Sequence, residues 1–133
     1  MEMRKVLAVV LLLAVVLSAV GCKSGGATVT LREVDTGRTV ELKRGDQLIL
    51  ELEGNPTTGF QWQVQDMDAG ILKQQGDAEF KSDQQGAMGG GGLFVLTFAA
   101  TGTGSTPLRL IYHQTWDKET PPAKTFEVTV SVQ

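Results

Sequence analysis

Apolar and polar side chains alternate with a period of two along most of this chain. The alternation is cleanest at Phe60, Trp62 and Val64, where glutamine fills the intervening positions, and it recurs over residues 126–132. A period of two places every second side chain on one face of a β-strand. Further strands are predicted around similar apolar rows: Val29/Leu31/Val34, Val40/Leu42, Leu48/Leu50/Leu52, Phe94/Leu96/Phe98 and Leu108/Leu110/Tyr112. The chain is therefore predicted to be all-β.

About seven strands separated by Gly and Pro predict two packed antiparallel sheets, with a closed barrel as the alternative. We expect residues 35–37 to turn the first strand back onto an answering strand at Val40 and Leu42. A chain of 133 residues without an internal repeat has room for one ordinary domain, which we place at residues 28–133.

The first 21 residues have the pattern of a removable export signal. Two basic residues, Arg4 and Lys5, precede the apolar stretch 6–20, which is shorter than the ~20 residues of a membrane-spanning helix. The prediction is a signal peptide at 1–21, and the alternative is an uncleaved N-terminal anchor helix.

The single cysteine follows this stretch directly. Gly21-Cys22 resembles the end of a bacterial lipoprotein box, in which the cysteine is lipidated and becomes the mature N-terminus. Residues 22–27 would then be the lipidated cysteine and a flexible tether. We expect an exported protein held in the cell envelope by a lipid in a bacterial membrane; the alternative is secretion after cleavage near Ala19.

Composition excludes several kinds of function. The net charge is −3, with 12 basic and 15 acidic side chains, which disfavours nucleic acid as a partner. One cysteine allows no intrachain disulfide and no Cys-rich zinc site. The only histidine, His113, has no serine nucleophile motif to activate, and the carboxylates of 66–83 have no calcium-loop spacing. We expect no enzyme activity, no metal, no cofactor and a monomeric chain.

Three connections between strands are suited to contact. In the central loop, 54–59, Asn55 can bond its own backbone, Pro56 fixes φ and Gly59 can adopt a positive φ. This predicts a stiff projection with Thr57 and Thr58 outward, although such a segment can also be an ordinary turn.

The other two connections are less specific. Residues 84–92 are rich in glycine but lack the Lys-Ser/Thr of a phosphate loop, so they are either a linker or a loop with bare backbone against a partner. In the third connection, 112–122, Trp116 lies among charged residues where the alternation has ended. Trp116 is either an interface anchor or a lid folded over the end of the sandwich.

Together these loops resemble those of the chagasin-like inhibitors of papain-family cysteine proteases. The resemblance rests on the block 55–62, the glycines before an aromatic strand, the segment from Tyr112 to Trp116, and 121–126. It implies an immunoglobulin-like sandwich whose three loops enter the protease cleft as a wedge and inhibit reversibly. The protease-binding residues that it implies are Asn55, Pro56, Thr57, Thr58, Gly59, Phe60, Gly89, Gly90, Gly91, Gly92, Gln114, Thr115 and Trp116.

The third loop departs from the family pattern. Gln114 and Thr115 stand where the family usually has Arg-Pro before the tryptophan. Losing the proline leaves more loop entropy to be lost on binding, and losing the arginine removes a charge-assisted contact of ~1.5–3 kcal/mol. Weaker or altered inhibition is one expectation. The alternative is a non-inhibitory envelope binding or scaffold lipoprotein that uses the same loops for another protein or a glycan.

Overall fold

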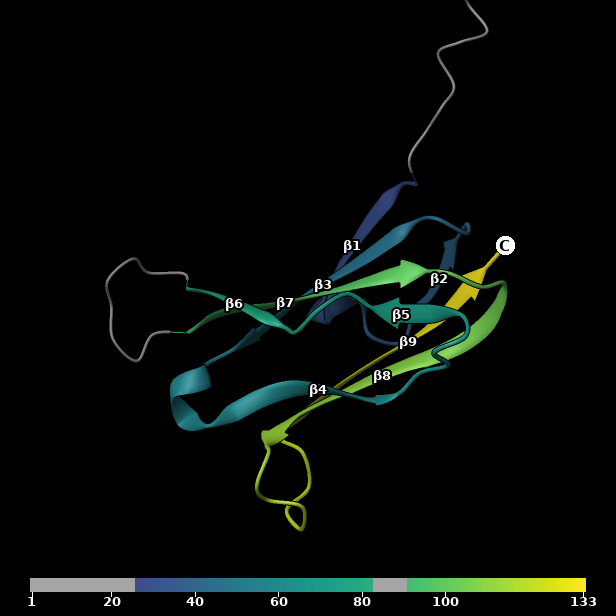
Figure 1. The fold of residues 1–133 in the computed structure, drawn as a ribbon. Coiled ribbons are helices and arrows are strands. Elements are labelled where there is room, and N and C mark those ends of the chain that lie inside the picture. Colours follow the sequence, from purple (N-terminus) through teal and green to yellow (C-terminus); the bar gives the residue numbers. More distant parts are fainter. Residues whose placement is uncertain (1–25, 83–90) are drawn as a thin grey trace, which may run out of the picture.

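The computed structural model describes residues 26–82 and 91–133, which contain nine strands and two short 3-10 turns joined by loops (Figure 1). The predicted signal peptide (1–21) and Cys22 lie outside the described residues. Within those residues, no helix is long and apolar enough to cross a membrane. The elements, in chain order, are β1 (Thr28–Arg32), η1 (Glu33–Asp35), β2 (Thr39–Leu42), β3 (Gln47–Gly54), η2 (Pro56–Thr58), β4 (Phe60–Asp66), β5 (Leu72–Gln74), β6 (Glu79–Ser82), β7 (Gly92–Ala100), β8 (Gly104–Gln114) and β9 (Lys124–Val132).

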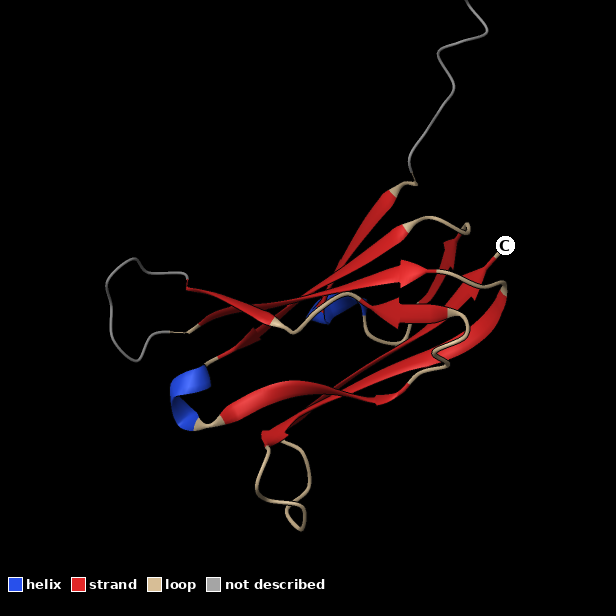
Figure 2. Cartoon of the chain, viewed as in Figure 1, coloured by secondary structure: helices blue, strands red, loops and turns tan. Residues whose placement is uncertain are grey.

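The strands form two sheets that pack face to face (Figure 2). One sheet has the order β1-β3-β7-β5, with β6 also paired to β7, and the other has the order β2-β9-β8-β4. The predicted all-β sandwich is confirmed, and the chain does not close into the alternative barrel. The structure adds two parallel pairings, of β1 with β3 and of β2 with β9, to an otherwise antiparallel arrangement.

The strand at Val40 and Leu42 does not answer the first strand, so that expected pairing was wrong. β2 instead lies in the opposite sheet, where Val40 pairs with Val130 and Leu42 with Val132. The connection is fastened to β9, since the N–H of Gly37 donates to the carbonyl of Glu127 at 2.7 Å. The chain therefore crosses between sheets, a choice of partner that a period of two does not specify.

The core consists of the apolar rows that the alternation predicted, with one correction: Val34 was expected in the first strand but lies in η1 and is 88% exposed. Cross-strand pairs on β3 and β7 fill one layer, with Leu48 beside Phe98, Leu50 beside Leu96 and Leu52 beside Phe94. These side chains are all 5% exposed or less. Fully burying one such side chain contributes ~1.5–3 kcal/mol. The facing layer is formed by Trp62, Leu108, Leu110, Tyr112, Phe126, Val128, Val130 and Val132. The result is a rigid body from which the loops project.

Candidate functional site

The central loop is a single 3-10 turn closed by its own side chains. Asn55 is the N-cap, and its Oδ1 accepts hydrogen bonds from the backbone N–H of Thr57 at 3.0 Å and from its hydroxyl at 2.6 Å. Pro56 begins the turn, and Gly59 ends it with φ of 81°, in the left-handed region. Thr57 and Thr58 are exposed, as expected. The projection predicted from the sequence is therefore formed.

Two buried aromatic side chains hold the base of this loop. The hydroxyl of Tyr112 accepts a hydrogen bond from the N–H of Asn55 at 2.8 Å, and the indole N–H of Trp62 donates to the carbonyl of Glu53 at 3.0 Å. The Tyr112 ring also contacts those of Phe60 and Trp62, with centroids 5.2 and 5.1 Å away. Phe60 is thus half-buried support for the loop. The sequence placed Tyr112 in an apolar row and gave no signal of its bond to the central loop.

Glu33 also contacts the base of the central loop. The carboxylate of Glu33, in η1, accepts the N–H of Glu53 at 2.8 Å and lies 3.6 Å from the Nζ of Lys124. That ammonium group is also 5.6 Å from the centre of the Tyr112 ring. β1 ends at Arg32, opposite Glu51, whereas its partner β3 continues to Gly54. Beyond the end of β1, the Glu33 carboxylate accepts the hydrogen bond of the Glu53 N–H.

The third loop, between β8 and β9, is ordered around Asp117. Its N–H donates to the carbonyl of Gln114 at 3.0 Å, and its Oδ1 accepts the N–H groups of Glu119 and Thr120, each at 3.1 Å. The Thr120 side chain and these backbone donors favour the charged form and lower the pKa of Asp117. The loop thus has a stiff turn even without the family's proline.

Trp116 projects from this turn toward solvent. Its side chain is 69% exposed, so it does not act as the lid that was one of the two expectations. The indole lies against Gly59, where an added Cβ would collide with Cη2 of Trp116. The third loop and the central loop therefore touch through a residue without a side chain. Thr115 beside it is exposed.

The side chain of His113, on β8, has a hydrogen-bond partner on the neighbouring strand. Its Nε2 lies 2.7 Å from Oε1 of Gln63 on the neighbouring strand β4. Among the described residues, no group of three or more His, Cys, Asp and Glu side chains is placed to hold a metal ion.

The glycine-rich connection begins and ends beside the central loop. Gly92 pairs with Gly54 on β3 and with Ser82 on β6. Gly91 and Gly92, together with Asn55 and Tyr112, line a shallow pocket of about 400 Å³. Gly89 and Gly90 lie outside the described residues.

The central loop, the third loop and the described ends of the glycine-rich connection lie at one end of the sandwich. Figure 1 shows η2, the β8–β9 connection and the adjoining ends of β6 and β7 together at this end. Strand pairing agrees, since Gly54 is beside Gly92 and Phe60 is beside Gln114. We call this end the loop pole.

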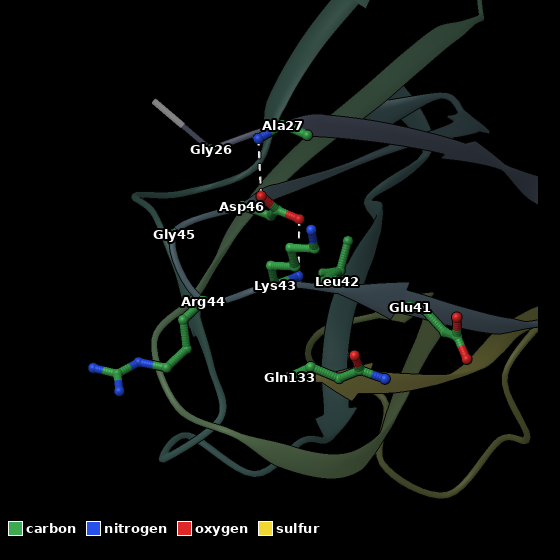
Figure 3. Close-up of a pocket in the computed structure, with 9 residues that line it drawn as sticks. All are labelled: Gly26, Ala27, Glu41, Leu42, Lys43, Arg44, Gly45, Asp46 and Gln133. Atoms are coloured by element: carbon green, nitrogen blue, oxygen red, sulfur yellow. Dashed lines mark hydrogen bonds between the residues drawn. The ribbon is translucent and has the colours of Figure 1, made fainter. Parts of the chain in front are cut away.

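A different pocket, of about 640 Å³, lies at the opposite pole (Figure 3). Here the carboxylate of Asp46 accepts the N–H of Lys43 and the N–H of Ala27, both at 2.8 Å. These two bonds hold the pKa of Asp46 below its usual value. They join the β2–β3 turn to the residue before β1, so the chain enters the domain far from the loop pole.

Fold and site together define a loop-presenting β-sandwich whose rigid turns are gathered at one pole. A sequence model of the chagasin family peptidase inhibitor I42 matches residues 41–130. The chain is 31% identical over 106 residues to Amoebiasin-1 of Entamoeba histolytica, an alignment that covers 78% of this chain and 99% of that protein. The chain belongs to the chagasin family of peptidase inhibitors, which confirms the resemblance stated above.

Solved structures show the same fold. A cysteine protease inhibitor from Entamoeba histolytica has a TM-score of 0.71 at 18% identity, over 84% of this chain and all of that one. PbICP-C, solved in complex with falcipain-2, has a TM-score of 0.55 at 19% identity, over 81% of this chain and all of that one. At these identities the likeness establishes the architecture.

Proposed function

We propose that this chain inhibits papain-family cysteine proteases reversibly, by placing the loop pole in the active-site cleft, without a cofactor and without catalysis of its own. The observation that carries the proposal is that the central loop, the third loop and the described ends of the glycine-rich connection share one pole, with the central loop fixed by Tyr112 and in contact with Trp116. A preformed wedge loses little conformational entropy on binding.

The shape of the central loop explains how an inhibitor survives in a protease cleft. A substrate is cut in an extended pose, but here the N–H of Thr58 points back to the carbonyl of Asn55 at 3.4 Å and Gly59 to Pro56 at 3.1 Å. Opening this turn also breaks the bonds to the Asn55 side chain. A wedge of three loops buries ~800 Å² per partner in a protease–inhibitor interface of standard size.

Two relatives support the target class. The Entamoeba histolytica structure is of a cysteine protease inhibitor, and PbICP-C was solved bound to falcipain-2. Membership of the same family makes a thiol protease the partner to test first.

The test is a titration of papain with purified residues 23–133, with folding checked by circular dichroism. We expect stoichiometric loss of activity that dilution restores, with the inhibitor recovered uncut. A folded domain that fails to inhibit at micromolar concentration contradicts the proposal and favours the scaffold alternative, which a pull-down of envelope components would then test.

We further propose that the protein is exported and held on a bacterial membrane by a lipid on Cys22. The position of Ala27 at the pole opposite the loops supports this, because a tether leaving there would point the loop pole away from the membrane (Figures 1 and 3). Cys22→Ser should move the protein from the membrane fraction to the soluble fraction of the envelope. Unchanged membrane association would favour the uncleaved anchor helix.

A further inference from the structure

Gln114 makes a contact that its expected role as a protease ligand does not include. It is the last residue of β8, paired with Phe60 on β4, at the point where the third loop begins. Its side-chain Nε2 donates to the carbonyl of Thr58 at 3.2 Å. A side chain of the third loop is thus bonded to the backbone of the central loop.

Both residues of this contact lie where a loop begins or ends. Thr58 is the last residue of η2, so no backbone N–H of a following helical turn can donate to its carbonyl. The backbone carbonyl of Gln114 accepts the N–H of Asp117, which closes the turn that carries Trp116. One residue therefore links the end of the central loop to the start of the tryptophan turn.

Gly59 completes the link on the other side. The indole of Trp116 occupies the space where a side chain at position 59 would stand. A hydrogen bond at Gln114 and a packing contact at Gly59 are two separate restraints on the third loop. A side chain 69% exposed has few other contacts to fix its direction.

We propose that Gln114 is a positioning residue, which fastens the third loop to the central loop so that Trp116 is presented in one orientation before any protease arrives. The inference rests on the proposed inhibitory function for its consequence, but the fastening itself is a property of the unbound chain. In this chain the central loop sets the orientation of the third loop. Gln114 therefore acts within the inhibitor and not as a ligand of the enzyme.

The test compares Gln114→Met and Gln114→Glu with Gln61→Met in the purified chain. Methionine keeps the length of glutamine without a donor, and glutamate keeps its shape with a charge. Gln61 is an exposed glutamine on β4, near the same pole, so Gln61→Met is the matched control. Thermal melts establish that each variant is folded.

The first measurement is the time-resolved fluorescence anisotropy of the unbound chain. Trp62 is 4% exposed and serves as a rigid internal reference, so added fast depolarisation reports on Trp116. We expect both Gln114 variants to gain a fast component and Gln61→Met to match the wild type. Unchanged anisotropy in both Gln114 variants overturns the proposal.

The second measurement is inhibition of papain by the same variants. We expect each Gln114 variant to weaken inhibition about 3- to 10-fold, the loss of one net hydrogen bond, chiefly through slower association. Weaker inhibition with unchanged anisotropy identifies Gln114 as a protease contact and refutes the positioning role. If the wild type inhibits no protease, the anisotropy result still decides whether Gln114 fastens the loop.

Discussion

The phenolic oxygen of Tyr112 lies 2.8 Å from the backbone nitrogen of Asn55 and accepts its hydrogen bond. Tyr112 is on β8, and 57 residues separate it from Asn55. The bond joins the end of one sheet to the loop that leaves the other. A core side chain thus fixes the position of the central loop.

Tyr112→Phe should therefore loosen the central loop without emptying the core. The phenylalanine keeps the ring contacts with Phe60 and Trp62 but leaves the N–H of Asn55 without this acceptor. We expect inhibition of papain to weaken by about 1 kcal/mol, or about fivefold in the inhibition constant. Hydrogen exchange at the Asn55 amide should become faster. Wild-type exchange at that amide would show that the bond does not restrain the loop.

Trp116→Ala should weaken inhibition by ~2 kcal/mol or more, as expected for an aromatic interface anchor. The free energy of unfolding should hardly change, because the side chain is 69% exposed. Val34→Ala is the control for truncating an exposed apolar side chain, since Val34 is 88% exposed and belongs to none of the three loops. Equal inhibition by Trp116→Ala and the wild type would exclude the anchor role.

Gly59→Ala combines backbone strain with a collision. The left-handed φ of 81° costs an L-residue ~1 kcal/mol, and the new Cβ would displace the indole of Trp116. The matched control is Gly37→Ala, where φ is 87° and no atom lies within 4 Å of the added Cβ. Urea denaturation should show both variants destabilised, whereas papain titration should show weaker inhibition for Gly59→Ala alone. Equal inhibition by the two variants would mean that the Gly59–Trp116 contact is dispensable.

Asp46 should make the stability of the domain depend on pH at acid values. The N–H groups of Lys43 and Ala27 lower its pKa in the folded state. Its stabilising contribution is therefore complete above the ordinary pKa of an aspartate, ~3.9, and is lost as the pH falls through the lowered folded value. Urea denaturation at a series of pH values should show a shallower acid decline for Asp46→Asn. An identical pH profile for variant and wild type would rule out this linkage.

The sequence predicted the parts of the site that depend on local chemistry. Asn55, Pro56 and Gly59 each prefer the turn conformation that they adopt, so the central loop could be predicted from residue types alone. Strands with strict alternation, such as the one carrying Trp62, were also placed correctly. These features follow from contacts within a few residues along the chain.

The rest depends on contacts between distant segments. β2 lies beside β9 and not beside β1, although its alternation is compatible with either partner. The bond from Gln114 to Thr58 joins residues 56 positions apart, and no local pattern predicts it. Periodicity identifies which side chains share a face, but it leaves open which segment will cover them.

The parallel pairing of β1 with β3 has a practical consequence. It brings Ala27 to the pocket that Gln133 also lines (Figure 3), at the end of the fold opposite the central and third loops (Figure 1). A dye, a bead or a fused carrier protein could be attached at either end while the loops stay accessible. The same scaffold would then serve as an oriented capture reagent on a sensor chip.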